Sequence, residues 1–276
     1  MRFQTTLLYL LFLCTFSGGY AQVLLTEGAP VYNVNFGTPM QSTVGYNTYN
    51  GGGFSPTLIS GRLNSAAWET TGWENGDLYF NGAMSNPAHG RGSVSGGVVT
   101  EGLYAYTDNP ASVANPTLLI QAGDNDFANG TLALKIKNNG TTNMTQIQVS
   151  YNLFVRNDKD RSHHFNFSHS ADNVVYEPEP SLDYTTPDTA DAFQWTQVGV
   201  SPSRSIFITG LNIAPGGVYY IRWSCSDPGG TGDWDEIGLD DITITGTYGP
   251  PAAEINVIGS SSLTIIHNDM TPIVAD

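Results

Sequence analysis

Cysteine is nearly absent from this chain, which has two cysteines in 276 residues, Cys14 and Cys225. Because only Cys225 lies outside the first 21 residues, the rest of the chain cannot form an internal disulfide and needs a hydrophobic core for stability. Basic residues are also scarce, with ten Lys and Arg against 25 Asp and Glu. Without Arg2, nine basic residues face 25 acidic ones, and the net charge is −16. Such a surface repels phosphate groups, so we expect no binding to nucleic acid.

Long hydrophobic runs and helical periods are missing from the chain after its N-terminus. We therefore expect neither a membrane span nor a helical bundle. The one apolar run, LLYLLFLCTF, follows Arg2 and precedes a small-residue segment that ends at Ala21. These features predict that residues 1–21 are a secretory signal peptide, and that the protein is secreted or displayed at the cell surface.

Short alternating segments separated by Gly, Pro and Asn make up most of the chain. In the clearest one, apolar residues from Ile147 to Val155 alternate with polar residues, which is the period of a strand with one buried face. Similar segments occur at 131–137, 163–169 and 218–224. About a dozen short strands without helices predict an all-β fold, a two-sheet antiparallel jelly-roll sandwich over residues 22–248.

The composition changes after residue 248, where a Pro- and Ala-containing linker covers residues 249–253. Residues 254–276 then contain two further strand patterns, Glu254–Ile258 and Leu263–Ile266. So short a segment cannot bury a core of its own. We interpret it as the start of an immunoglobulin-like β-domain, truncated here, so that the sandwich is covalently linked to further domains in a longer protein.

The most acidic stretch lies between two strand patterns, from residue 227 to residue 241. Carboxylates this close together repel one another unless a cation, backbone donors or water separate them. Calcium is the expected cation, because it binds six to eight oxygen ligands. The candidate ligands are Asp227, Asp233, Asp235, Glu236 and Asp240. In the alternative interpretation, these carboxylates cap turns and pair with Arg222 or with solvent.

Catalytic residues are not evident, and we predict that the chain is not an enzyme. Glu236 and Asp240 share one face of a strand, but positions i and i+4 are about 13 Å apart. Glycoside hydrolases need two carboxyl groups about 5 to 9.5 Å apart. A polysaccharide hydrolase or lyase stays the alternative, and it requires two carboxylates, or a Tyr and His pair with an Arg, in one groove.

Aromatic residues are the other candidate ligand-binding groups, because the faces of Tyr and Trp rings stack on sugars. The candidates are Trp68, Trp73, Tyr220 and Trp234, with Tyr104 and Tyr106 as further platforms. His163 and His169 cannot share a metal ion, because six strand positions separate them by about 20 Å.

Three stretches, HGRGSVSGGVVTEGLYAY, the run from TLALKIKNNG to FNFSHSADN, and GVYYIRWSCSDPGGTGDWDEIGLDDITIT, resemble a β-sandwich module of secreted bacterial proteins. Such modules are similar to concanavalin and laminin-G-type jelly rolls, and they occur in Bacteroidetes-type bacteria beside extracellular nucleases or phosphatases. The segment EINVIG is similar to the opening strand of immunoglobulin-like repeats. The resemblance implies an accessory module that binds an extracellular glycan or a cell-surface component. A purely structural spacer is the third alternative.

Overall fold

The computed structural model describes residues 22–37, 40, 44–82, 89–108, 110–191 and 194–249, together with three short strands between residues 255 and 274. The predicted signal peptide lies outside the described residues. Every named element in this described part is a strand, and no helix there is long and apolar enough to cross a membrane.

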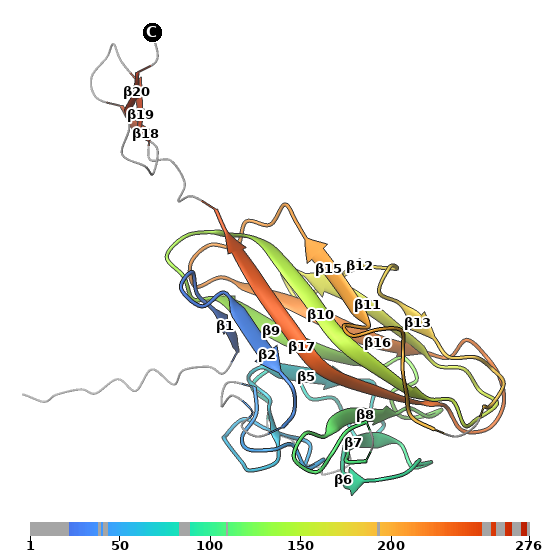
Figure 1. The fold of residues 1–276 in the computed structure, drawn as a ribbon. Helices are drawn as coiled ribbons and strands as arrows, with labels where there is room; N and C mark the ends of the chain where they lie inside the picture. Colours follow the sequence, from blue (N-terminus) through green and yellow to red (C-terminus); the bar gives the residue numbers. More distant parts are fainter. Residues whose placement is uncertain are drawn as a thin grey trace, which may run out of the picture.

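Two sheets form the sandwich (Figure 1). The seven-stranded sheet has the order β1-β9-β16-β11-β12, with β5 beside β9 and β13 beside β11. Its strands are β1 (Val23–Leu25), β5 (Trp68–Thr71), β9 (Thr131–Asn138), β11 (His164–Ser170), β12 (Glu177–Pro178), β13 (Tyr184–Thr185) and β16 (Val218–Ser226).

The eight-stranded sheet has the order β14-β10-β17-β8-β7-β6, with β15 beside β10 and β2 beside β17. Its strands are β2 (Val31–Val34), β6 (Gly90–Val94), β7 (Gly102–Tyr106), β8 (Thr117–Gln121), β10 (Met144–Arg156), β14 (Thr196–Gln197), β15 (Arg204–Ile208) and β17 (Glu236–Tyr248). A separate parallel pair joins β3 (Phe54–Ser55) to β4 (Leu63–Asn64).

Successive long strands alternate between the two sheets, because β8 and β10 belong to one sheet while β9 and β11 belong to the other. This exchange confirms the predicted all-β, two-sheet jelly-roll sandwich. Most pairs are antiparallel, but β1 runs parallel to β9 and β6 runs parallel to β7.

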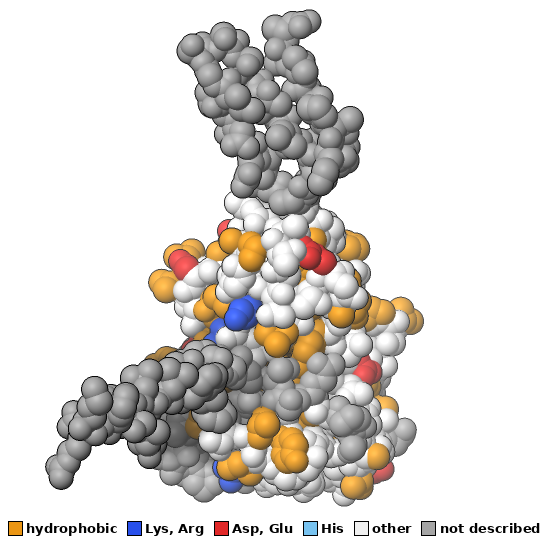
Figure 2. All heavy atoms as spheres, turned by 90° about the vertical axis from the view of Figure 1, so that its left-hand side faces the viewer, with side chains coloured by type: hydrophobic (Ala, Val, Ile, Leu, Met, Phe, Trp, Pro, Cys, Tyr) orange, Lys and Arg blue, Asp and Glu red, His pale blue; other side chains and the backbone are white. Residues whose placement is uncertain are grey.

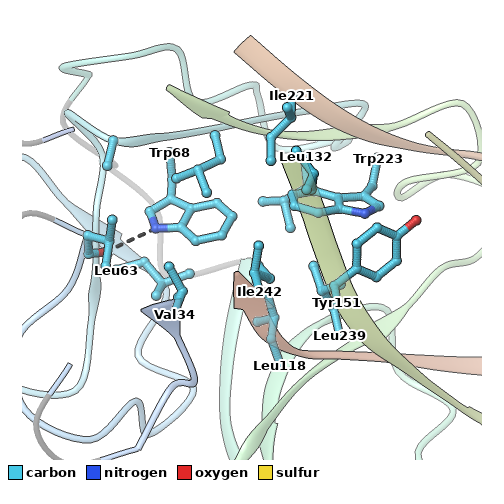
Figure 3. Packing of buried hydrophobic residues seen from close by; sticks show 14 of the residues in the cluster. Val34, Leu63, Trp68, Leu118, Leu132, Tyr151, Ile221, Trp223, Leu239 and Ile242 are labelled. Atoms are coloured by element: carbon cyan, nitrogen blue, oxygen red, sulfur yellow. Dashed lines mark hydrogen bonds between the residues drawn. The ribbon is translucent and has the colours of Figure 1, made fainter. Parts of the chain in front are cut away.

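The core lies between the inner faces of the two sheets, where large side chains from both interdigitate (Figure 3). Trp68 on β5, Trp223 on β16 and Tyr151 on β10 are almost fully buried. The indole N–H of Trp68 donates a hydrogen bond of 3.0 Å to the carbonyl of Val44, so its one polar atom is satisfied.

The alternating patterns predicted the long strands β9, β10, β11 and β16 correctly. Residues 57–60 form a bend, irregular backbone and a turn, and residues 76–80 contribute only an isolated bridge at Leu78. The glycine-rich segment 90–94 forms strand β6. Its backbone hydrogen bonds stabilise it at the sheet edge although its side chains show no apolar alternation.

A bulge interrupts β17 at Asp241, which has a φ of 48°. Before it, residues 237–239 pair with β8, and after it, residues 242–245 pair with β2. The extra residue therefore turns the strand between two different neighbours while β10 follows its other edge.

Strands β18 (Ile255–Val257), β19 (Leu263–Ile266) and β20 (Pro272–Val274) form a small antiparallel sheet. Two of them lie where the sequence predicts strands. The immunoglobulin-like character of this segment stays a prediction.

Candidate functional site

The five candidate calcium ligands do not converge on one point. Among the described residues, no group of three or more His, Cys, Asp or Glu side chains is arranged to hold a metal ion. Asp233 is exposed, whereas Asp235, Glu236 and Asp240 are buried and contact different partners. Asp235 accepts a hydrogen bond from the N–H of Lys159, Glu236 accepts one from Val98, and Asp240 accepts one from Asp241. Backbone donors thus separate these carboxylates.

Arg161 organises the exposed part of the acidic loop. Its Nη2 lies 2.6 Å from Asp227 and 2.5 Å from Asp124, so one guanidinium bridges two carboxylates that are distant in the sequence. Its Nη1 donates to the carbonyl of Gly232, and its Cζ lies 5.0 Å from the ring centroid of Trp234. The sequence had suggested Arg222 as the cation here, but Arg222 lies on another face.

Burial raises the pKa values of the carboxyl groups at the start of β17. The pKa of Asp235 is raised to about 6 and that of Asp240 to about 8, in both cases mainly by desolvation. Desolvation, together with the nearby Asp158, raises the pKa of Glu236 as well. Glu236 and Asp240 project from the same face of β17 with Gly238 between them. They are four strand positions apart, about 13 Å, which is too far for the paired carboxyl groups of a glycoside hydrolase.

Three of the four aromatic candidates are core residues, so their prediction as stacking platforms is wrong. Trp68, Trp73 and Trp234 expose 0%, 5% and 1% of their surface, and a ring without an exposed face cannot stack on a sugar. Tyr104 and Tyr106 are also buried. Large aromatic side chains have the most apolar area, so burying them in the core stabilises the fold more than burying smaller side chains does.

Tyr220 is the exception, because it projects from the outer face of the seven-stranded sheet. On β16, Tyr219, Ile221 and Trp223 face the core, while Tyr220 and Arg222 alternate with them and stay half-buried. Around Tyr220 lies a set of aromatic and charged side chains that we call the aromatic-basic face. Its members are Glu69, Phe80, Lys135, Tyr176, Tyr220 and Arg222.

Ring contacts connect the members of the aromatic-basic face. The ring centroids of Phe80 and Tyr220 are 5.5 Å apart. The Nζ of Lys135 lies 4.6 Å from the Phe80 centroid, and the Cζ of Arg222 lies 3.5 Å from the Tyr176 centroid. Each cation therefore lies against an aromatic ring, an arrangement that favours the charged form of the basic group.

Glu69 holds the two loops that carry Phe80 and Tyr176. Its Oε2 accepts a hydrogen bond of 3.3 Å from the N–H of Phe80, and its Oε1 accepts one of 3.4 Å from the side-chain amide of Asn173. The carboxamide oxygen of Asn173 in turn accepts a hydrogen bond from the Tyr176 hydroxyl. One carboxylate on β5 thus fixes both rings relative to the sheet.

Desolvation affects all three charged groups of this face. It raises the pKa of Glu69 and lowers the pKa values of Lys135 and Arg222. The sequence analysis missed Glu69, Phe80, Lys135 and Tyr176 as site residues. The sequence could have indicated Arg222 as a site residue, because positions i and i+2 of a strand share a face and Tyr220 was already a candidate.

A cleft of about 410 Å³ opens at the edge of the sandwich, beside the turn that carries Tyr176. His169 and Tyr219 line it, with Ile208 and Leu211 from the opposite side. The ring of His169 lies between the Tyr219 hydroxyl (2.7 Å) and the carboxylate of Glu179 (3.3 Å). No Lys or Arg lines this cleft, and burial raises the pKa of Tyr219 to about 12. The cleft therefore provides the Tyr and His that a polysaccharide lyase requires, but not the Arg.

Two other histidines are buried. His89 is 2% exposed, and its ring centroid lies 4.6 Å from that of Trp73. His163 lies between the Asp235 carbonyl and the Cys225 thiol, and desolvation lowers its pKa to about 4.

In the view of Figure 2, hydrophobic side chains lie in small separate groups and charged side chains are few. That side of the molecule therefore presents no broad apolar surface among the coloured residues.

Comparisons with known proteins return structural likenesses only. No family model and no curated protein matches the chain. The K1 cleaved adhesin domain of Lys-gingipain from Porphyromonas gingivalis W83 is 11% identical with a TM-score of 0.35, and the match covers 79% of this chain and 98% of that domain. A non-crystalline cellulose specific carbohydrate-binding module, CBM28, is 11% identical with a TM-score of 0.33, covering 65% and 87%. TmCBM61, solved with beta-1,4-galactotriose, is 11% identical with a TM-score of 0.31, covering 52% and 82%. Likenesses of this size cannot transfer a function, so the function has to be argued from this chain's own residues.

Proposed function

We propose that this chain is a secreted or cell-surface binding module without catalytic activity, and that it binds a glycan on the aromatic-basic face. The observation that carries the proposal is the convergence of Phe80, Tyr176 and Tyr220 on the outer side of one sheet, from two loops and a strand. A core does not need these rings, because the core lies on the other side of the sheet.

The chemistry of the face suits a sugar. Aromatic rings supply flat apolar surface for the C–H faces of a pyranose, and neighbouring polar groups fix its orientation through hydrogen bonds. The Ser168 hydroxyl, which accepts from Arg222 Nε at 3.3 Å, and the Asn173 amide lie beside the rings. Because Glu69 already fixes both loops, little side-chain freedom is lost on binding.

The test is glycan-array screening of the purified protein, followed by calorimetric titration of the best ligand. Tyr220→Ala is expected to weaken binding about tenfold or more, as for a central aromatic contact in other interfaces. Tyr46→Ala is the matched control, because Tyr46 is 42% exposed and does not belong to the aromatic-basic face. Equal losses in both variants, or no glycan bound at all, would refute the proposal.

A further inference from the structure

Two cations, Lys135 and Arg222, belong to the aromatic-basic face. Lys135 is 7% exposed and Arg222 is half-buried. Within the part of the chain that the structure describes, neither residue takes part in an ion pair, whereas Arg156, Lys159 and Arg161 each pair with an aspartate. Arg62, Arg91, Lys137 and Arg204 form no ion pair there either, so what distinguishes Lys135 and Arg222 is that both lie on one face, each against an aromatic ring.

The charge of Glu69 acts on both cations and raises their pKa values, but Glu69 forms an ion pair with neither. Both of its oxygens accept hydrogen bonds from the loops, one from the Phe80 N–H and one from Asn173. Asp172, whose charge acts on Tyr176 and Tyr220, accepts hydrogen bonds from the N–H groups of Val174 and Val175. The hydrogen bonds of both nearby carboxylates are therefore directed at the loops and not at the two cations.

Burying a cation without a partner costs free energy, because water no longer solvates it. That cost is visible in the lowered pKa values of Lys135 and Arg222. An anion that binds against both groups forms charge-assisted hydrogen bonds in a partly desolvated place, where they are stronger than in water. The unfavourable desolvation of the two cations is already present in the free protein, and their interaction with the anion offsets it in the complex.

The strand register places both cations within reach of one anion. Arg222 lies opposite Ala133, and Tyr220 lies opposite Lys135, on the antiparallel strands β16 and β9. Arg222 and Lys135 are therefore diagonal neighbours on one face, and such positions lie about 7 to 8 Å apart. Long side chains bridge that distance, and the ring of Tyr220 lies next to both.

We propose that the glycan bound by the aromatic-basic face is anionic, and that its carboxylate or sulfate group binds to Arg222 and Lys135 while a sugar ring stacks on Tyr220. This inference rests on the proposed function and adds the substrate class to it. The overall charge of −16 does not oppose it at physiological salt, because charges beyond about 8 Å are largely screened there.

The experiment compares polymers that share a backbone and differ in charge. Polygalacturonate is tested against its methyl ester, and dextran sulfate against dextran, by affinity electrophoresis and calorimetry at 0.15 M NaCl, about physiological ionic strength. We expect a charged polymer to bind at least about tenfold more tightly than its neutral counterpart. The first pair reports on carboxylate and the second on sulfate.

Variants assign the preference to the face. Arg222→Gln is expected to abolish the difference between charged and neutral polymers, and Arg222→Lys to retain part of it. Arg91→Gln, which removes the same charge from an exposed side chain on β6 of the other sheet, is the control and should leave the preference unchanged. Unfolding curves of each variant establish that it is folded.

A probe without a polymer backbone completes the test. Titration with glucuronate and with sulfate, followed through the NMR signal of the Arg222 guanidinium, should give a saturable shift. Neutral glycans bound as tightly as acidic ones, with no shift by either anion, would overturn the anionic class and leave glycan binding intact. Binding to no glycan and no anion would overturn both proposals.

Discussion

Asp240→Asn isolates the effect of one buried carboxyl group on stability. The Asp240 carboxyl accepts hydrogen bonds from the Asp241 N–H at 2.8 Å and from the Thr117 hydroxyl at 3.2 Å. An asparagine amide can accept the first bond through its oxygen and donate to the hydroxyl oxygen through its nitrogen. The substitution thus preserves the shape and the hydrogen bonds, and it removes only the titration.

The magnitude follows from the pKa of Asp240, which desolvation and the neighbouring Asp241 raise from 3.8 to about 8. In the unfolded chain this carboxyl ionises near pH 4, so between about pH 4 and pH 8 the folded protein binds one more proton than the unfolded chain. Its contribution to stability is therefore fully present below pH 4 and is lost as the pH rises to about 8. The loss amounts to about 1.4 kcal/mol per pH unit, or on the order of 4 kcal/mol from pH 5 to pH 8.

The assay is thermal and urea unfolding of both proteins at pH 5, 6, 7 and 8. Other titrating groups, including Asp235 and Glu236, contribute equally to both proteins and cancel in the difference. We expect Asp240→Asn to become more stable relative to the native protein with each increase in pH, and its Tm at pH 8 to be higher by on the order of 10 °C. A difference that stays constant with pH would refute the reasoning, because it would mean that the folded protein already holds Asp240 ionised at pH 5.

Two further predictions concern the acidic loop and the free thiol. Because Asp227 pairs with Arg161 and Asp235 binds backbone donors, we expect Tm in CaCl2 and in EDTA to agree within about 1 °C; a rise of several degrees with calcium would instead indicate an ion that binds native protein. Cys225 is 3% exposed and burial raises the pKa of its thiol, so a thiol reagent at pH 8 should label it only as fast as the protein unfolds, with rates that rise in parallel with urea-induced unfolding. Labelling at the rate of a free thiol in native conditions would contradict this burial.

The parts of the fold that the sequence predicts well are those with one strictly alternating buried face. In β10, every second residue from Ile147 to Val155 is buried in the core, as the pattern requires. The same holds for Phe165 and Phe167 on β11. A period of two determines which side chains face inward, and this is independent of which strand becomes the neighbour.

Pairings and burial of single residues are the parts that the sequence does not determine. Strand β1 pairs in parallel with β9, more than a hundred residues later, and nothing local encodes that partner. Trp68 and Tyr220 were both candidates for an exposed ring, yet one is in the core and the other on the outer face. The difference depends on whether another element covers that side of the strand.

The candidate site shows the same limit. Glu69, Phe80 and Tyr176 come from separate segments, and only the tertiary structure brings them to Tyr220. The acidic stretch was the more conspicuous pattern in the sequence, but Arg161 and backbone N–H groups stabilise it locally. The crowded pattern of one charge thus lies where Arg161 and backbone donors stabilise it, and the face that we propose as the ligand site lies elsewhere.

The order of strands in the sheets has a consequence for how the protein is made. Among the described residues, strand β2 at residues 31–34 pairs with β17 alone, and residues 242–245 of β17 are among the last of the sandwich to be synthesised. Strand β1 likewise pairs with β9, which is synthesised more than a hundred residues later, and β9 pairs with β16, which is synthesised later still. The chain therefore cannot complete its sheets progressively from the N-terminus as it emerges. Such non-local pairing makes folding slow, typically milliseconds to seconds, and during that time the first strands depend on remaining soluble with unpaired edges.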